Sequence, residues 1–273
     1  MKKRKFGLFL SAAILTGVLA ACGSDDGNTG KALSEDKLLI GVTAGPHEQI
    51  MEVVEEVAAE KGLDIELKVF SDYVLPNTSL DEGSIDANSY QHAPYLKQFN
   101  EDKGMDLVSI GSTYISPMGF YSDKYDDFKD IPKGATIGIP NDPTNSTRAL
   151  YILEEAGFIK INKEKRAKAT IHDLDENPKK LKFIELEAAQ MPKQLTEVDA
   201  AAINTNFALE AGIKPSEDAL LIEATDSPYA NHLVVRAENK DDAAAKLLVE
   251  SYQSEKVKKF IEEEFDGSIL PTW

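Results

Sequence analysis

Aromatic and amide side chains, together with one arginine, accumulate directly after the strands that the sequence predicts. The first group follows the early strands and comprises Tyr73, Asn77, Tyr90, His92, Tyr95 and Tyr114. The second group follows the later strands and comprises Asn141, Asn145, Arg148, Asn204, Asn206, Tyr229 and Asn231. Because ligands of α/β sheets bind beyond the carboxyl ends of the strands, these side chains are candidates for one binding site.

A cleft with rings on one wall and with an arginine and amides on the other suits a small zwitterion. The guanidinium of Arg148 can hold a carboxylate through two parallel N–H donors. Amide oxygens can accept hydrogen bonds from an ammonium group, and aromatic rings can cover an apolar side chain. Arg148 is predicted in the first turn of a helix, where backbone N–H groups and the helix dipole add to the attraction for an anion.

Each of these residues also has an explanation that needs no ligand. Arg148 could form a surface ion pair in an acidic protein, and the asparagines could be turn or N-cap residues. Tyr90 and Tyr95 could be half-buried core aromatics, and His92, close to Pro94, could be a loop histidine with satisfied hydrogen bonds. The functional interpretation depends on the coincidence of these residues at successive strand ends.

Short apolar or alternating segments that favour strands are separated by amphipathic segments that favour helices. The predicted strands are 38–42, 65–69, 85–87, 107–110, 135–140, 182–187, 198–203 and 233–235, and the main predicted helices are 50–58, 149–156, 241–250 and 255–264. This alternation predicts an α/β fold with doubly wound parallel sheets flanked by helices. The strand, loop and helix at 38–58 recur at 135–156, which indicates two related lobes that face each other.

The first 36 residues are predicted to target and tether the protein. Four cations precede the apolar run 6–21, a pattern that is typical of a secretory signal and too short for a stable membrane span. The run ends in Leu19-Ala20-Ala21-Cys22, which resembles the bacterial lipobox, so we expect cleavage of the signal 1–21 and acylation of Cys22. Residues 22–36 are then the lipidated cysteine and a flexible tether. The alternative is a secretory signal that leaves a free Cys22.

The charge balance excludes some classes of partner. The chain carries 30 basic and 47 acidic residues, a net charge of −17, and loss of the four cations of the signal gives −21. A nucleic-acid partner is not expected, because phosphate binding needs a basic surface. With one cysteine, the chain has neither an intramolecular disulfide nor a Cys-rich metal site.

Five segments of the chain resemble those of a known family. They are Asn88–Leu96 (NSYQHAPYL), Pro117–Ser122 (PMGFYS), Ile139–Leu150 (IPNDPTNSTRAL), Ala202–Ala208 (AINTNFA) and Pro228–Asn231 (PYAN). Together with the lipobox, they are similar to segments of the NlpA/MetQ lipoproteins along the whole chain. That family provides the substrate-binding subunits of methionine ABC importers.

The resemblance implies a two-lobed, periplasmic-binding-protein-like fold, with lobe 1 formed by residues 37–114 and 226–273 and lobe 2 by residues 115–225. It implies a lipid-anchored, extracytoplasmic binding protein that is not an enzyme and has no cofactor and no metal. Such a protein captures methionine, as the L-form, the D-form or a Met-containing dipeptide, and delivers it to a membrane permease and its ATPase. The family's contacts to the amino-acid backbone carry over to Asn145, Arg148, Asn204 and Asn231, and its side-chain pocket to Tyr73, Tyr90, His92 and Tyr95.

The sequence departs from the family pattern at two places. Ser146-Thr147 stands where the family commonly has two glycines, and Tyr90 stands where it commonly has phenylalanine. Serine and threonine suit a helix N-terminus, so recognition of the amino-acid backbone is expected to survive. Tyr90, by contrast, adds a hydroxyl to the aromatic side of the pocket, which is expected to contact the thioether of methionine.

Two other classes of function remain as alternatives. A metal-binding lipoprotein of an ABC importer could use His47, His92 and His232, which lie near strand ends, although none has a partner at metal-motif spacing. An exported enzyme is the other alternative. The sequence has no Gly-x-Ser-x-Gly, no His-Glu-x-x-His and no phosphate-binding loop, and Cys22 is committed to lipid.

Overall fold

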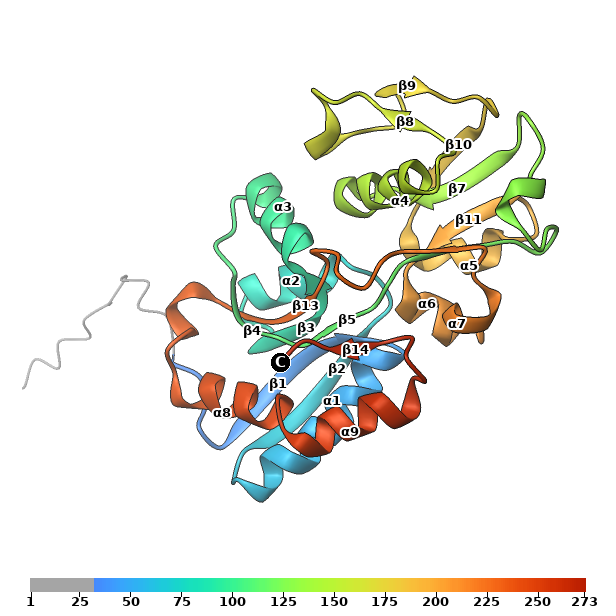
Figure 1. Cartoon of the computed structure of the whole chain (residues 1–273). Coiled ribbons are helices and arrows are strands. Elements are labelled where there is room, and N and C mark those ends of the chain that lie inside the picture. The colour runs from blue at the N-terminus through green and yellow to red at the C-terminus, as the bar shows by residue number, and fades with distance from the viewer. Residues whose placement is uncertain (1–31) are drawn as a thin grey trace, which may run out of the picture. The chain divides into compact units, whose positions relative to one another are not determined.

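A computed structural model describes residues 32–273. Two five-stranded sheets form the centre of the described chain, and each is flanked by helices (Figure 1). Two small two-stranded sheets pair β5 (Tyr114–Ile115) with β14 (Leu270–Pro271), and β8 (Lys160–Ile161) with β9 (Leu174–Glu176). The predicted signal and lipidated cysteine lie outside the described residues. No helix within residues 32–273 is long and apolar enough to span a bilayer.

The first sheet has the strand order β2-β1-β3-β13-β4. Its strands are β1 (Lys37–Thr43), β2 (Asp64–Phe70), β3 (Ala87–His92), β4 (Val108–Ser112) and β13 (Asn231–Val235), and its helices are α1 (Pro46–Glu60), α2 (Leu75–Asp81), α3 (Ala93–Lys103), α8 (Ala243–Tyr252) and α9 (Glu255–Glu264). β1 pairs in parallel with β2 and β3, whereas β13 runs antiparallel to both β3 and β4. The late strand β13 thus joins β3 to β4, two strands from the first half of the chain.

The second sheet has the order β10-β7-β11-β6-β12. Its strands are β6 (Gly119–Tyr121), β7 (Thr136–Pro140), β10 (Lys182–Leu186), β11 (Ala200–Ile203) and β12 (Leu221–Ile222), and its α-helices are α4 (Pro143–Glu155), α5 (Met191–Gln194), α6 (Thr205–Glu210) and α7 (Pro215–Asp218). Short 3₁₀ helices lie at η1 (Phe128–Asp130), η2 (Arg166–Lys168), η3 (Ala188–Gln190) and η4 (Ala237–Asn239). Here β6 is the reversed strand, antiparallel to β11 and β12.

Continuous apolar strands form where helices cover both faces of a sheet. In the first sheet α1, α8 and α9 pack on one face, around Ile40 and Leu233, while α2 and α3 pack on the other, around Phe70 and Val234 (Figure 1). In the second sheet α4 covers one face, and α5 and α6 cover the other. Helix α1 begins at Pro46, a residue that favours the first helical position, and ends before Gly62, whose φ of 91° only glycine adopts readily.

The structure corrects two sequence-based expectations. The sheets are mixed rather than parallel, because each contains one reversed strand. The segment after Ala87 was expected to leave the sheet but is strand β3 itself, with all six residues buried. Leu33, within the predicted tether, is buried and its N–H donates to Asp242 Oδ2 at 2.8 Å, and the first strand begins at Lys37. The predicted lobe boundaries stay a prediction.

Polar residues remain within strand β3 because a buried amide cluster satisfies them. Asn77 of α2 accepts hydrogen bonds through Oδ1 from Gln91 Nε2 at 2.5 Å and from Asn88 Nδ2 at 2.9 Å, and its own Nδ2 donates to Gln91 Oε1 at 2.8 Å. Buried polar groups are tolerated when they are hydrogen-bonded in this way. The cluster fixes Asn88 and Gln91 in the same strand that carries Tyr90 and His92.

The reversed strands bring distant segments to one edge of each sheet. In the first sheet the carboxyl end of β3 at His92 pairs with the amino end of β13 at Asn231. In the second sheet Ile203 at the end of β11 and Ile222 at the end of β12 both pair with Gly119 at the start of β6. Each edge therefore carries side chains from both halves of the chain.

Candidate functional site

A buried cavity lies among side chains of both sheets. It encloses about 320 Å³ of space. Its lining residues are His47, Tyr73, Tyr90, Gln91, His92, Tyr95, Ser116, Asn145, Arg148, Asn204, Asn206 and Asn231. The eight residues predicted to contact a ligand are all in this set.

Helix α4 begins earlier than predicted, and this changes the setting of Arg148. Asp142 is the N-cap residue, and its Oδ1 accepts from the backbone N–H of Asn145 at 2.9 Å. Arg148 is consequently in the second turn of the helix rather than the first. Its side chain is 3% exposed, which excludes a surface ion pair.

The guanidinium of Arg148 is held in place by a buried carboxylate that sequence analysis missed. Nε donates to Glu223 Oε1 at 2.9 Å, and Nη2 donates to Glu223 Oε2 and to the backbone oxygen of Ser116 at 2.9 Å. The guanidinium also stacks on the ring of Tyr229, 4.4 Å from its centroid. The two parallel donors expected to hold a ligand therefore bind Glu223. Within residues 32–273, Nη1 has no hydrogen-bond partner.

Glu223 follows the two-residue strand β12, and nothing in the local pattern marks it. The side chain is 7% exposed, and its Oε2 also accepts from Met118 N–H at 3.2 Å. A lone glutamate in a chain with 47 acidic residues looks like any surface carboxylate. Glu223 could not be recognised from its neighbours in the sequence, because the pairing of β12 with β6 brings it to Arg148.

Asn145 orients its neighbours and has no side-chain group left for a ligand. Its Oδ1 lies 3.1 Å from both His92 Nε2 and Asn204 Nδ2, and its Nδ2 donates to the two carboxylate oxygens of Asp142 at 3.1 and 3.0 Å. Asn145 is therefore a positioning residue that joins the end of β3 to the end of β11.

His92 is the N-cap residue of α3, and both of its ring nitrogens are engaged. Nδ1 accepts from the Tyr95 N–H at 3.1 Å, so the proton is on Nε2, which donates to Asn145. Burial, and then the positive charge of Arg148, lowers the pKa of His92 to about 3. The ring is therefore neutral at physiological pH. Both ring nitrogens of His92 are therefore hydrogen-bonded within the protein, as the ligand-free explanation expects, while the ring itself lines the cavity.

The asparagines after β11 leave polar atoms free inside the cavity. Asn204 is the N-cap residue of α6, but its side chain makes no capping bond. Within residues 32–273, Asn204 Oδ1 and Asn206 Nδ2 are buried and have no hydrogen-bond partner. Such buried groups are rare, so these two atoms are available for a ligand. Asn231, at the start of β13, is also buried against the cavity.

Three tyrosines form one wall of the cavity, which we call the tyrosine wall: Tyr73, Tyr90 and Tyr95. Their ring centroids are 5.8 to 6.1 Å apart. The hydroxyls of Tyr90 and Tyr95 both donate to the backbone oxygen of Tyr73, at 2.8 and 2.9 Å, and the Tyr73 hydroxyl donates to Asn206 Oδ1 at 2.5 Å. The hydroxyl that Tyr90 adds is thus bonded within the protein.

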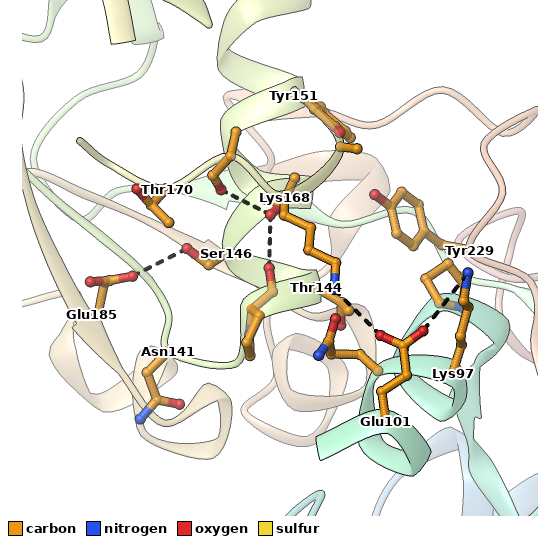
Figure 2. A pocket seen from close by; sticks show the side chains of 16 residues that line it. Lys97, Glu101, Asn141, Thr144, Ser146, Tyr151, Lys168, Thr170, Glu185 and Tyr229 are labelled. Carbon is orange, nitrogen blue, oxygen red and sulfur yellow. Dashed lines mark hydrogen bonds and ion pairs between the residues drawn. The ribbon is translucent and has the colours of Figure 1, made fainter. Parts of the chain in front are cut away.

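A second, more open cavity lies between α3 and the start of α4 and encloses about 940 Å³ of space (Figure 2). Its charged side chains pair with one another: Glu101 with Lys97 at 4.0 Å and with Lys168 at 3.3 Å. Ser146 donates to Glu185 at 3.2 Å, as Figure 2 shows. Asn141 and Tyr229 line this cavity and not the first one, although the ring of Tyr229 still contacts Arg148 and His92 of the first cavity.

The three histidines of the metal-site alternative have separate partners. Nδ1 of His47 lies 2.8 Å from Thr43 Oγ1, Nδ1 of His232 lies 2.7 Å from Ser109 Oγ, and His92 is bound as above. Within the described part of the chain, no three His, Cys, Asp or Glu side chains are grouped to hold a metal ion.

Comparisons with known proteins identify relatives along almost the whole chain. The D-methionine-binding lipoprotein MetQ of Salmonella typhi is 40% identical over 274 residues, covering 98% of this chain and 99% of that protein. A nutrient-binding protein of Burkholderia cenocepacia, solved bound to methionine, is 48% identical, with a TM-score of 0.85 and coverage of 86% and 100%. A putative methionine-binding lipoprotein of Bacillus subtilis is 37% identical, with a TM-score of 0.85 and coverage of 87% and 98%. Residues 38–273 match the NlpA lipoprotein description, and the chain therefore belongs to the NlpA lipoprotein family.

Proposed function

We propose that this protein is the lipid-anchored substrate-binding protein of an ABC importer, and that it captures methionine in the buried cavity and delivers it to a membrane permease and its ATPase. It acts at the extracytoplasmic face of the membrane, held by lipid on Cys22, and is a binding protein rather than an enzyme. The observation that carries the proposal is the set of unpartnered polar atoms that face the tyrosine wall.

These atoms match the two charged ends of an amino acid. Arg148 Nη1 and Asn206 Nδ2 are donors suited to a carboxylate, and Asn204 Oδ1 is an acceptor suited to an ammonium group. The Arg148–Glu223 pair carries no net charge, and a zwitterion also carries none. Binding therefore leaves no uncompensated charge in a buried site, which would be costly.

The tyrosine wall favours an apolar, polarizable side chain. Because its hydroxyls are bonded within the protein, the wall offers ring surfaces to the ligand rather than donors. Each contact of a thioether sulfur with a ring contributes roughly 0.3–1.5 kcal/mol. A polar side chain would lose its water without gaining partners, at about 1–3 kcal/mol. The names of the relatives reported above refer to methionine, which agrees with this chemistry.

The test measures which ligand the mature protein binds and how selectively. Mass spectrometry of ligand released from denatured protein should detect methionine, and calorimetry should give at least tenfold tighter binding of methionine than of glutamine or serine. Titration with L-methionine, D-methionine and a Met dipeptide identifies the preferred form. Displacement of methionine by an equal concentration of glutamine would overturn the methionine assignment.

A pair of variants tests the role of the tyrosine wall. Tyr95→Ala removes a ring and should reduce the preference for methionine over glutamine, whereas Tyr95→Phe keeps the ring, loses only the bond to Tyr73 O, and should retain that preference. If Tyr95→Ala loses thermal stability but keeps its selectivity, Tyr95 belongs to the core and not to the site.

A further inference from the structure

One polar group on the wall of the cavity is not used by the proposed contacts. His47 is 3% exposed, lines the cavity and lies on the first turn of α1. Its Nδ1 is 2.8 Å from Thr43 Oγ1, whereas Nε2 is buried and has no hydrogen-bond partner within residues 32–273. Leaving a buried polar atom unpaired costs stability, and because this atom belongs to a residue that lines the cavity, a ligand there can supply its partner.

The bond to Thr43 determines what Nε2 can offer. The Thr43 hydroxyl is fully buried, and its only hydrogen-bond partner among the described residues is His47 Nδ1. If the hydroxyl donates to Nδ1, the ring proton is on Nε2 and one buried group is left unpaired. If Nδ1 donates instead, the hydroxyl proton and Nε2 are both left unpaired. The first arrangement leaves fewer unpaired groups, so Nε2 carries a proton and is a donor. Burial lowers the pKa of His47 to about 3, which keeps the ring neutral.

The surroundings of this donor favour an anion. His47 is the second residue of α1, a helix of 15 residues whose N-cap, Gly45, offers no side-chain cap. The positive end of the helix dipole and the unpaired N–H groups of the first turn attract negative charge. Glu48, in the same turn, is half-buried and does not line the cavity. A Cβ built on Gly45 would lie 3.2 Å from the backbone oxygen of Asn206, so this turn adjoins the segment that carries the free Asn206 Nδ2.

We propose that His47 Nε2–H binds the carboxylate of the amino-acid ligand. This inference rests on the proposed function and adds a contact from the first sheet to those that Arg148 and Asn206 supply from the second. The carboxylate then bridges the two sheets, and its binding holds them together around the ligand. The occupant of His47 Nε2 is thus the ligand itself rather than a water molecule or another side chain.

Two variants separate the nitrogens of the ring. His47→Asn places an amide near the position of Nδ1 and can keep the bond to Thr43, but it lacks the Nε2 donor. His47→Gln can place an N–H near the position of Nε2. Because a hydrogen bond to a charged group is stronger than a neutral one, His47→Asn should weaken L-methionine binding about tenfold or more, while His47→Gln should retain most of the affinity.

A second ligand tests which group of the ligand is bound. L-methioninol keeps the amine and the thioether but replaces the carboxylate with an alcohol. If Nε2 binds the carboxylate, His47→Asn should weaken methionine binding at least fivefold more than methioninol binding, as measured by calorimetry on the mature protein. Unfolding in urea, followed without ligand, confirms that both variants are folded.

The outcomes distinguish this inference from the proposed function. Equal loss for methionine and methioninol, or unchanged affinity in folded His47→Asn, overturns the His47 contact and leaves the methionine assignment intact. Failure of the wild-type protein to bind methionine overturns the proposed function itself. A tenfold loss that is specific to methionine and is rescued by His47→Gln supports both.

Discussion

Arg148 and Glu223 form a buried ion pair whose two members depend on each other. Both side chains are less than a tenth exposed, and both carboxylate oxygens of Glu223 accept from the guanidinium. Removing one partner of such a pair leaves a buried charge without compensation, which typically costs about 3–5 kcal/mol. Replacement of Arg148 alone therefore mixes lost ligand affinity with lost stability.

Glu223→Gln is expected to lower the free energy of unfolding by about 3 kcal/mol, because the cation of Arg148 is left buried. The matched control is Glu176→Gln, whose partner Lys160 is at 2.8 Å in a pair about half exposed, and which should cost less than about 1 kcal/mol. Urea unfolding of the two variants measures both values. Equal small losses would contradict the importance that we assign to the buried pair.

The double variant Arg148→Leu/Glu223→Leu removes both charges together. It should be more stable than either single variant, because apolar residues can replace a buried pair without leaving a charge behind. It should nevertheless lose more than tenfold in methionine affinity, because the donor Nη1 is gone. Calorimetry on this folded variant measures the ligand contact alone, and unchanged affinity would remove Arg148 from the binding site.

The N-terminus of α4 positions polar side chains that line the cavity: Asn145 and, through it, His92 and Asn204. Asp142 caps the helix and also accepts from the side chains of Thr144 and Asn145. Asn145 in turn orients His92 and Asn204. The cap is therefore connected to the cavity through a continuous chain of hydrogen bonds.

Asp142→Ala is expected to lower the free energy of unfolding by about 1–2 kcal/mol and to weaken methionine binding about tenfold, because Asn145 loses its anchor. Ser254→Ala is the control. Ser254 caps α9 through Val257 N–H at 3.4 Å, away from the cavity, so its loss should reduce stability and leave affinity unchanged. Identical binding by the two variants would show that the cap of α4 has no influence on the site.

The sequence predicted the elements that have a strong apolar period and missed those that tertiary contacts create. The predicted helix 255–264 matches α9. The predicted strand 38–42 lies within β1, and its continuous apolar pattern arises because helices bury both faces of that strand. The polar strand β3 was missed after residue 87, since its buried amides are satisfied only by Asn77 from another element. The two-residue strand β12 has no period at all.

Contact of the predicted site residues with a ligand stays a prediction, and the hydrogen bonds among these residues were not predicted from the sequence. The lining residues were found because they recur at strand ends and match family segments. Asn145 was predicted to contact the ligand, but all its side-chain groups are occupied by protein partners, and Glu223 was missed. Which atoms remain free depends on hydrogen bonds between distant segments, and a single sequence does not encode them locally.

Side-chain hydrogen bonds and one ion pair connect the elements of the first sheet to those of the second and close the cavity. Tyr73 binds Asn206, His92 binds Asn145, and on the outside Glu101 pairs with Lys168. Most of the cavity residues are buried, so we expect a ligand to enter when these contacts separate. Closure of the sheets around a ligand is the motion by which domain-closing binding proteins act.

Two buried histidines should make the stability of the whole protein depend on pH. The pKa values of His47 and His92 are lowered to about 3 in the folded state, whereas an unfolded histidine titrates near 6.5. Their contribution to the free energy of unfolding is therefore fully present above pH 6.5 and is lost as the pH falls toward 3. Each should reduce the free energy of unfolding by about 2 kcal/mol between pH 7 and pH 5. Urea unfolding at the two pH values measures this loss, and His47→Asn should reduce it by about half. A pH-independent stability over this range would contradict the neutral buried state of both rings.

We expect the residues before the folded unit to carry the membrane anchor. Cys22→Ala should move the protein from the membrane fraction to the soluble fraction, because the lipid is expected on this one thiol. Fractionation and immunoblotting measure the change, with Arg148→Leu/Glu223→Leu as a control that keeps Cys22. A variant that still sediments with membranes would refute the lipobox interpretation.

The place of β13 in the first sheet determines when that sheet can be completed during synthesis of the chain. Sheet neighbours β3 and β4 are made early, but β13, which lies between them, is made near the end of synthesis. β4 has no other neighbour in this sheet, so the first sheet stays incomplete until residue 235 is available. Pairings between such distant segments form slowly. The first sheet thus closes only after most of the chain has been synthesised.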